Sequence, residues 1–321
     1  MKILFITNMY PTAENSVFGI FVKEQIDDIV KALQVEWEVY FINARYEGKL
    51  KYLRSIFEIP LKIWRGKFDI VHIHYGLSAL FLLFFRPKAK IFLTLHGADI
   101  LIKQERRIQV WITKRILRKV DKVYILNPEM EAIVKPLNSN YEILPCGVNT
   151  DFFKPNGFKT NKEQSRKVVF TSNPQEKVKN FPLFQEVIQL LDKQSGKKIE
   201  YKCIHQLSRA GVRDLLNSAD CLLMTSISEG SPQVIKEALS CGLPIVSVPV
   251  GDVPSMTQDI PHCYVSNSYS PEELSDLVAL SFRRENGDTE VIRETFINKG
   301  IYDHVSVTRR LIENYRKALS I

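Results

Sequence analysis

The stretch CLLMTSISEGSPQVIKEALSCG occupies residues 221–242 and joins a buried strand to a short helix. Its first six residues form a continuous apolar run, as in a strand covered on both faces. In the segment that follows, Ser231 can cap a helix, Pro232 suits the first helical turn and Gly242 can end the helix. A strand that leads directly into a helix predicts one unit of a parallel α/β sheet.

Two glutamates of this stretch need an explanation. Glu229 precedes the helix, and Glu237 lies eight residues later at the edge of the apolar stripe, where an unpaired carboxylate is costly. The helix start at residues 230–232 offers backbone N–H groups to a diphosphate. Because helical side chains tilt toward the N-terminus, Glu237 would reach a ribose beside the phosphates, and Glu229 would face the sugar beyond them. The pattern predicts one carboxylate for each sugar of a nucleotide sugar. The alternative, equally open from the spacing, is that Glu229 caps the helix and Glu237 pairs with Lys or Arg.

Strand and helix patterns alternate along the rest of the chain. We expect strands at residues 2–7, 38–43, 70–74, 91–95, 122–126, 168–172, 199–204, 221–226 and 244–249. Amphipathic segments lie between them, and the polar stretch 153–167 is typical of a linker. The sequence therefore predicts an α/β protein with two doubly wound Rossmann-like domains facing a cleft, at residues 1–155 and 156–303. A last helix at 304–321 could cross back to the first domain.

Length and composition fit this two-domain interpretation. The chain has 321 residues, of which 45% are hydrophobic and 25% charged, and no apolar run is long enough to span a membrane. The start MKILFITNMYP has a strand pattern and not that of a signal peptide. Five scattered cysteines favour buried thiols in a reducing cytoplasm over disulfides or a zinc site. The net charge of +8 admits anionic ligands, anionic lipid or nucleic acid without choosing among them.

The turn after the first strand argues against a dinucleotide-binding oxidoreductase. Such a turn would carry G-x-G-x-x-G, but residues 8–21, NMYPTAENSVFGIF, contain only Gly19.

Several segments together resemble one family. Residues 226–254, SISEGSPQVIKEALSCGLPIVSVPVGDVP, are similar to the E-x7-E region of retaining glycosyltransferases of the GT-B fold, family 4 (glycosyl transferases group 1). Residues 10–25 resemble the glycine loop and first helix of that family. Residues 69–76, 93–100 and 143–155 resemble two of its strand ends and the segment that leads into its linker. The resemblance implies an acceptor-binding first domain and a nucleotide-sugar-binding second domain.

The resemblance also implies roles for individual residues. Three would be catalytic: His96 contacts the sugar from the acceptor side, Glu229 contacts the transferred sugar, and Lys179 stabilises the leaving phosphate. Donor binding is implied for Gly19, Asn173, Lys177, Gly230, Ser231, Pro232 and Glu237, and an orienting role for Asp99. His72 and His74 alternate along a strand, and we expect them to be packing residues.

One departure from the family pattern concerns the phosphates. The family has G-R followed by a lysine, but here Ser172 and Asn173 stand in place of G-R. Lys177 and Lys179 compete for the lysine role. We favour Lys179 because it directly precedes Asn180, which we expect to cap the following helix.

The implied reaction is transfer of a sugar from a UDP- or GDP-linked donor to an acceptor hydroxyl, with retention at the anomeric carbon. No Asp-x-Asp occurs in the sequence, so we expect neither a metal nor another cofactor. Two alternatives stay open: a sugar-nucleotide epimerase of similar architecture, and a non-catalytic nucleotide-binding partner of another transferase.

The acceptor is a saccharide or a lipid-linked saccharide in this interpretation. Residues 45–67 combine Lys and Arg with large apolar side chains, which suits either an anionic membrane surface or a solvated helix packed on a core. We therefore expect a cytoplasmic protein that could also contact the inner face of the membrane. No nucleic-acid motif is present, which disfavours nucleic acid as a partner.

Overall fold

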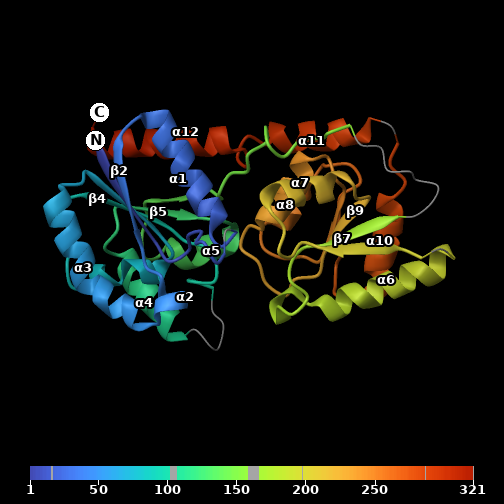
Figure 1. Cartoon of the computed structure of the whole chain (residues 1–321), viewed down its shortest axis with the longest axis horizontal. Coiled ribbons are helices and arrows are strands. Elements are labelled where there is room, and N and C mark those ends of the chain that lie inside the picture. Colours follow the sequence, from blue (N-terminus) through green and yellow to red (C-terminus); the bar gives the residue numbers. More distant parts are fainter. Residues whose placement is uncertain (16, 102–106, 158–165, 197, 286, 321) are drawn as a thin grey trace. The chain divides into compact units, whose positions relative to one another are not determined.

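Strands and helices alternate in two separate α/β units (Figure 1). The computed structural model describes residues 1–15, 17–101, 107–157, 166–196, 198–285 and 287–320. Unit 1 comprises Met1–Gly147 and His304–Ile321, and unit 2 comprises Val148–Asp303. The structure thus places residues 148–155, which the sequence assigned to the first domain, in unit 2. The reason is that the Val148 N–H donates to the Tyr302 carbonyl at 2.9 Å and Phe153 is fully buried in the core of unit 2.

Unit 1 contains a parallel sheet of six strands among the described residues, in the order β2-β1-β3-β4-β5-β6. The strands are β1 (Lys2–Thr7), β2 (Glu36–Phe41), β3 (Ile70–His74), β4 (Lys90–Thr94), β5 (Lys122–Ile125) and β6 (Tyr141–Ile143). The helices are α1 (Ile20–Leu33), α2 (Ala44–Glu47), α3 (Leu50–Gly66), the 3-10 helix η1 (Gly76–Leu83), α4 (Arg107–Leu117), α5 (Pro128–Val134) and α12 (His304–Leu319).

Both faces of this sheet are buried, which explains the nearly continuous apolar strands in the sequence. Ile3 and Phe5 of β1 point to one face, where α1 and α12 cover them, and Leu4 and Ile6 point to the other. Figure 1 shows α1 and α12 on one side of the strands and α3 and α4 on the other. The last helix therefore belongs to the core of unit 1, into which it buries Tyr315.

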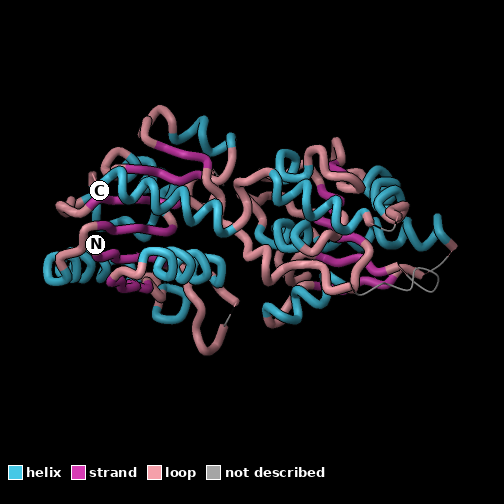
Figure 2. The backbone as a smooth tube through the Cα atoms, turned by 90° about the horizontal axis from the view of Figure 1, so that it is seen from above, coloured by secondary structure: helices cyan, strands magenta, loops and turns pink. Residues whose placement is uncertain are grey.

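Unit 2 contains a parallel sheet of five strands among its described residues, in the order β11-β10-β9-β7-β8. Figure 2 shows the strands in magenta and the helices that pack on them in cyan. The strands are β7 (Lys167–Phe170), β8 (Glu200–Cys203), β9 (Cys221–Met224), β10 (Ile245–Ser247) and β11 (Tyr264–Val265). The helices are the 3-10 helix η3 (Lys177–Lys179), α6 (Phe181–Ser195), α7 (Arg209–Asn217), α8 (Gln233–Ser240), α9 (Val253–Thr257), α10 (Pro271–Ser281) and α11 (Asp288–Asn298). The prediction of a strand followed by a short helix within 221–242 is confirmed by β9 and α8.

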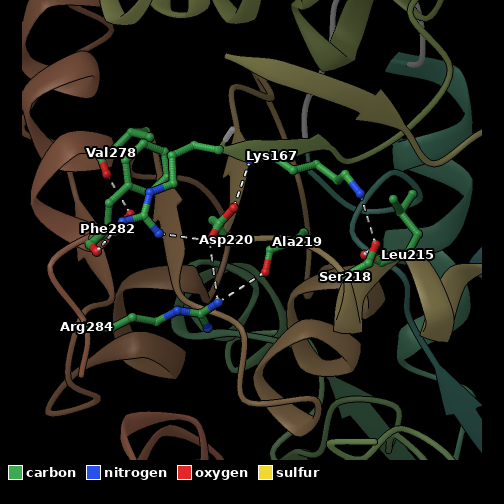
Figure 3. Close-up of polar contacts among 10 residues, drawn as sticks. Lys167, Leu215, Ser218, Ala219, Asp220, Val278, Phe282 and Arg284 are labelled. Carbon is green, nitrogen blue, oxygen red and sulfur yellow. Dashed lines mark hydrogen bonds and ion pairs between the residues drawn. The ribbon is translucent and has the colours of Figure 1, made fainter. Parts of the chain in front are cut away.

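A buried charge cluster fixes the amino end of this sheet (Figure 3). Asp220, directly before β9, accepts a hydrogen bond from the Lys167 N–H at 2.9 Å and pairs with Arg166 at 3.1 Å. Arg284 lies 3.8 Å from the same carboxylate and donates to the Ala219 carbonyl. These contacts join the starts of β7 and β9. In open parallel sheets, ligands bind at the opposite edge, beyond the carboxyl ends of the strands.

Two further expectations concern thiols and membrane spans. All five cysteines are free thiols, and burial raises the pKa of Cys221 and of Cys263 to about 12, so neither forms a thiolate near neutral pH. In the part of the chain that the structure describes, no helix combines the length and the apolar character that a membrane crossing requires.

Candidate active site

The loop that follows β9 brings Lys179 to the first glutamate. Thr225 donates through Oγ1 to the carbonyls of Lys179 and Asn180, each at 3.0 Å, and the Ile227 N–H donates to the Val178 carbonyl at 2.8 Å. These bonds hold η3 against the loop, and Lys179 Nζ lies 2.7 Å from Glu229 Oε1. The two side chains are only 20% and 14% exposed, so this ion pair is partly shielded from water.

Lys177 lies on the same turn of η3 and is exposed. The structure thus brings Lys179, and not Lys177, to Glu229. The prediction for Asn180 is only half right. Asn180 stands at the N-cap position of α6, but it adopts a left-handed conformation with φ 53° and its side chain caps nothing.

Glu237 of α8 meets an arginine that the sequence analysis did not single out. Arg209 Nη1 lies 2.5 Å from Glu237 Oε1, and the Glu237 side chain is only 5% exposed. Arg209 begins α7, where Ser208 caps the helix by accepting from the Gly211 N–H at 3.1 Å. The guanidinium also lies 4.6 Å from the centre of the Phe153 ring, which fixes its position. Arg209 is therefore the cation that the buried Glu237 carboxylate of α8 requires.

Of the two interpretations of the glutamates, the structure contains the pairing of Glu237 with an arginine. Glu229 is not the N-cap residue of α8, because Pro232 stands at that position and makes no side-chain cap. Each carboxylate is instead matched with one cation. Two cations and the start of an eight-residue helix therefore occur together around the loop after β9.

Asp252 holds the loop that contains Gly230 and Ser231. Ser231 Oγ donates to Asp252 Oδ2 at 2.6 Å, and the Asp252 N–H donates to the Gly230 carbonyl at 3.2 Å. The expectation that Ser231 caps α8 is therefore wrong. Burial raises the pKa of Asp252 to about 6, although the charge of Lys236 opposes this rise.

The residue before Asp252 has to be glycine. Gly251 has φ +57°, and a Cβ there would lie 2.6 Å from the Gly230 carbonyl oxygen, closer than any side chain can come. The sequence contained this signal in the GD pair of residues 251–252, which the motif analysis left without a role.

In unit 1, Asp99 joins the ends of two neighbouring strands. Its carboxylate accepts from the His96 N–H at 3.0 Å, after β4, and from the Gly76 N–H at 2.9 Å, after β3. Asp99 is fully buried, and burial raises its pKa to about 6 in spite of these backbone donors, which lower it. These contacts hold the loop that carries His96, and the orienting role of Asp99 in catalysis stays a prediction.

His96 ends a chain of three histidines. His74 Nδ1 lies 3.3 Å from His96 Nε2, and the rings of His72 and His74 are stacked with centres 4.6 Å apart. His72 in turn contacts the Thr94 hydroxyl at 2.8 Å and the hydroxyl of Tyr315 on α12. Burial lowers the pKa of His72 to about 3 and that of His74 well below its usual value, so both rings are neutral at pH 7. We expected His72 and His74 only to pack, so their polar contacts were missed. Their two-residue spacing on the strand did indicate that both side chains point to the same face of the sheet.

Gly19 allows a close approach within unit 1. It has φ +69° directly before α1, and a Cβ there would lie 2.4–2.7 Å from the backbone of Met9 and Tyr10. The glycine therefore lets the loop after β1 pack on the start of α1, where the Phe21 ring contacts the His96 ring edge-on at 5.4 Å. Its implied role toward phosphates stays a prediction.

Asn173 bonds within its own turn. Its side-chain oxygen accepts from the Gln175 N–H at 3.0 Å, so the residue shapes the loop after β7. Among the described residues, no group of three or more His, Cys, Asp or Glu side chains is arranged to hold a metal ion.

Two parallel-sheet α/β units, with cations and carboxylates after the strands of the second, are the architecture of the GT-B fold. Residues 184–296 match the family Glycosyl transferases group 1, and residues 22–152 match Glycosyltransferase Family 4. The chain belongs to the group 1 glycosyltransferases.

The relatives cover most or all of the chain. TuaC of Bacillus subtilis (strain 168), provisionally named as a teichuronic acid biosynthesis glycosyltransferase, is 22% identical, and the match covers 80% of this chain and 83% of TuaC. Sucrose-phosphate synthase from Thermosynechococcus elongatus is 13% identical with a TM-score of 0.77 and covers 100% of this chain and 99% of its own. Anabaena HepE in complex with UDP is 13% identical with a TM-score of 0.72 and covers 99% and 100%. The two structures are similar to this chain in fold.

Proposed function

We propose that this enzyme transfers a sugar from a nucleoside diphosphate sugar to a hydroxyl of a saccharide or lipid-linked saccharide, with retention at the anomeric carbon. The observation that carries the proposal is the matching of each site carboxylate with a cation, Glu229 with Lys179 and Glu237 with Arg209. A nucleotide sugar presents hydroxyls on two sugars and negative charge between them, so it suits carboxylates and cations in one site. HepE has been crystallised with UDP-glucose, which makes UDP the first nucleotide to test.

In this mechanism Glu237 accepts hydrogen bonds from the ribose hydroxyls, and Glu229 accepts hydrogen bonds from hydroxyls of the transferred sugar. Lys179 and Arg209 stabilise the charge that develops on the leaving diphosphate, together with the amides of the first turn of α8. The Asp252 contacts hold the loop at Gly230 and Ser231, so these amides need no rearrangement when the bond to the sugar breaks. The leaving phosphate takes the proton of the incoming hydroxyl. No metal and no further cofactor take part in this scheme.

The name of one relative supports the proposed acceptor class. TuaC carries a name from teichuronic acid biosynthesis, which supports synthesis of a cell-surface polysaccharide as the setting of the reaction. We place the enzyme in the cytoplasm, where nucleotide sugars are made.

A thermal-shift screen of nucleoside diphosphates and their sugars tests the donor. The expected result is a rise in melting temperature with one nucleoside diphosphate, and an equal or larger rise with the corresponding nucleoside diphosphate sugar. When an acceptor extract is added to that nucleotide sugar, the enzyme should release the nucleoside diphosphate. Incubation with the nucleotide sugar alone separates the alternatives. Interconversion of the sugar without an acceptor would identify an epimerase, and binding without turnover on any acceptor would identify a non-catalytic partner.

A further inference from the structure

Large apolar side chains line the solvent side of α3. They are Leu50, Leu53, Phe57, Leu61 and Trp64, which are 71%, 55%, 77%, 45% and 74% exposed. Their spacing of three or four residues places them on one face, which we call the outer face of α3. The buried residues of the same helix include Ile59 and Ile63. Ile59 lies two residues, about 200°, from Phe57, so the outer face points away from the core of unit 1.

The outer face is unusual because a surface helix normally exposes polar residues opposite its buried side. Single exposed apolar residues are common, but a row of five on one helix marks a surface that binds a partner or a membrane. The core does not explain the row, because α3 already packs on unit 1 through Ile59 and Ile63.

The charges around the outer face select the partner. Residues 44–67 contain seven cationic and two acidic side chains, a net charge of +5. The two acidic residues are Glu47, paired with Lys51 at 2.9 Å, and Glu58, paired with Arg54 at 3.1 Å. Exposed cations also stand at both ends of the row, Lys49 beside Leu50 and Arg65 beside Trp64.

This combination fits anionic lipid better than another protein. Aromatic and aliphatic side chains on one face, bordered by Lys and Arg, are typical of a helix that lies in the plane of a membrane interface. Protein interfaces, by contrast, are depleted in lysine. At 1.5 Å per residue, the 17 residues of α3 provide a contact line of about 25 Å.

We propose that the outer face of α3 docks flat on an anionic bilayer surface. The five apolar side chains enter the headgroup region, while Lys49 and Arg65 contact anionic headgroups. Docking would hold unit 1 at the surface from which a lipid-linked acceptor is presented. This consequence rests on the proposed function, whereas the docking itself depends only on α3.

Co-sedimentation with vesicles tests the proposal without donor or acceptor. The full chain should bind vesicles of equal parts phosphatidylglycerol and phosphatidylcholine, bind pure phosphatidylcholine at least tenfold more weakly, and lose binding in 0.5 M salt. The variant F57S/W64S should bind the anionic vesicles at least tenfold more weakly than the parent. K49E/R65E should show the same loss, because reversing two cations removes the attraction to the surface.

A matched pair of variants controls for apolar exposure alone. L53S/L61S removes two side chains of the outer face, and V291S/V305S removes two from α11 and α12 that are 47% and 58% exposed. The first should weaken vesicle binding severalfold and the second should leave it unchanged. Equal melting temperatures of the variants and the parent verify that each variant folds.

Two results would overturn the proposal. One is that F57S/W64S sediments with anionic vesicles as strongly as the parent chain. The other is that the parent binds no vesicles but forms a dimer that F57S/W64S dissociates, which would make the outer face an interface between two copies. Either result leaves the nucleotide-sugar function untouched, and failure of every nucleotide to bind would leave vesicle binding untouched.

Discussion

Lys179 and Lys177 lie on one turn of η3, but only Lys179 contacts a site carboxylate. Replacing Lys179 with alanine should therefore lower the rate of sugar transfer far more than replacing Lys177. At the 2.7 Å separation from Glu229, the gross attraction between unit charges is about 6 kcal/mol at an effective dielectric constant of about 20. Desolvation cancels much of this. Loss of one such stabiliser typically costs about 3–4 kcal/mol of transition-state stabilisation, so we expect a rate loss of about 100-fold or more.

The assay is release of nucleoside diphosphate from the donor identified by the thermal-shift screen, with and without acceptor extract. K177A is the matched control and should stay within about threefold of the parent, because its ammonium lies in solvent. K179R keeps the charge and should recover part of the lost rate. Because K179A leaves Glu229 without its cation, the double variant K179A/E229A serves as a folding control with a melting temperature close to that of the parent. A larger loss in K177A than in K179A would move the phosphate site to Lys177 and refute the reasoning.

Four further expectations follow from the site. Glu237→Ala should weaken nucleoside diphosphate affinity at least tenfold by calorimetry, whereas Glu229→Ala should leave that affinity nearly intact and abolish turnover; similar behaviour of the two variants would contradict one carboxylate per sugar. Arg209→Ala should also weaken nucleoside diphosphate binding about tenfold or more, with partial recovery in Arg209→Lys, and unchanged binding would remove Arg209 from the phosphate site. Activity should survive chelation by EDTA, and a strict need for added magnesium or manganese would contradict the metal-free scheme. Finally, the folded-state pKa of His72 near 3 lies below the value of about 6.5 in an unfolded chain, so its contribution to stability is present above pH 6.5 and is lost as the pH falls toward 3. Asp99 offsets part of this loss, because its raised pKa of about 6 means that it takes up a proton in the folded state first. The melting temperature of His72→Gln should therefore fall less steeply with acid than that of the parent. An equal slope of melting temperature against pH would contradict this expectation.

The sequence predicts the α/β class because the central strands are buried on both faces and appear as apolar runs. Two strands had no such signal: β6 and β11 have three and two residues and stand at sheet edges, so they are too short for a pattern. The sequence placed the end of the first domain at residue 155, whereas unit 2 begins at Val148. Here too the local sequence did not show what is buried. Phe153 is a core residue of unit 2, but its neighbours KPNG resemble a linker. Residues 158–165 of that expected linker lie outside the described residues.

The site was predictable where local rules apply and not where partners are distant. Spacing and burial showed that Glu237 needs a cation, but Arg209 lies 28 residues away on another helix, and no periodic rule connects them. Ser231 followed the local rule for a helix cap, yet its hydroxyl donates to Asp252, 21 residues later. A serine hydroxyl can either accept from a helix N–H as a cap or donate to a carboxylate. Local sequence does not decide between the two, because the choice depends on how the loops pack.

The sheet order explains how the site can lack the family's arginine and still hold two cations. The arginine would stand after β7, where Asn173 now bonds to the Gln175 N–H. Lys179 follows β7, and Arg209 begins the helix that follows β8. Strands β8, β7 and β9 are parallel neighbours, so their carboxyl ends lie along one edge of the sheet. Arg209 after β8 therefore lies at the same edge as the residues after β7, and it pairs there with Glu237 on the helix after β9.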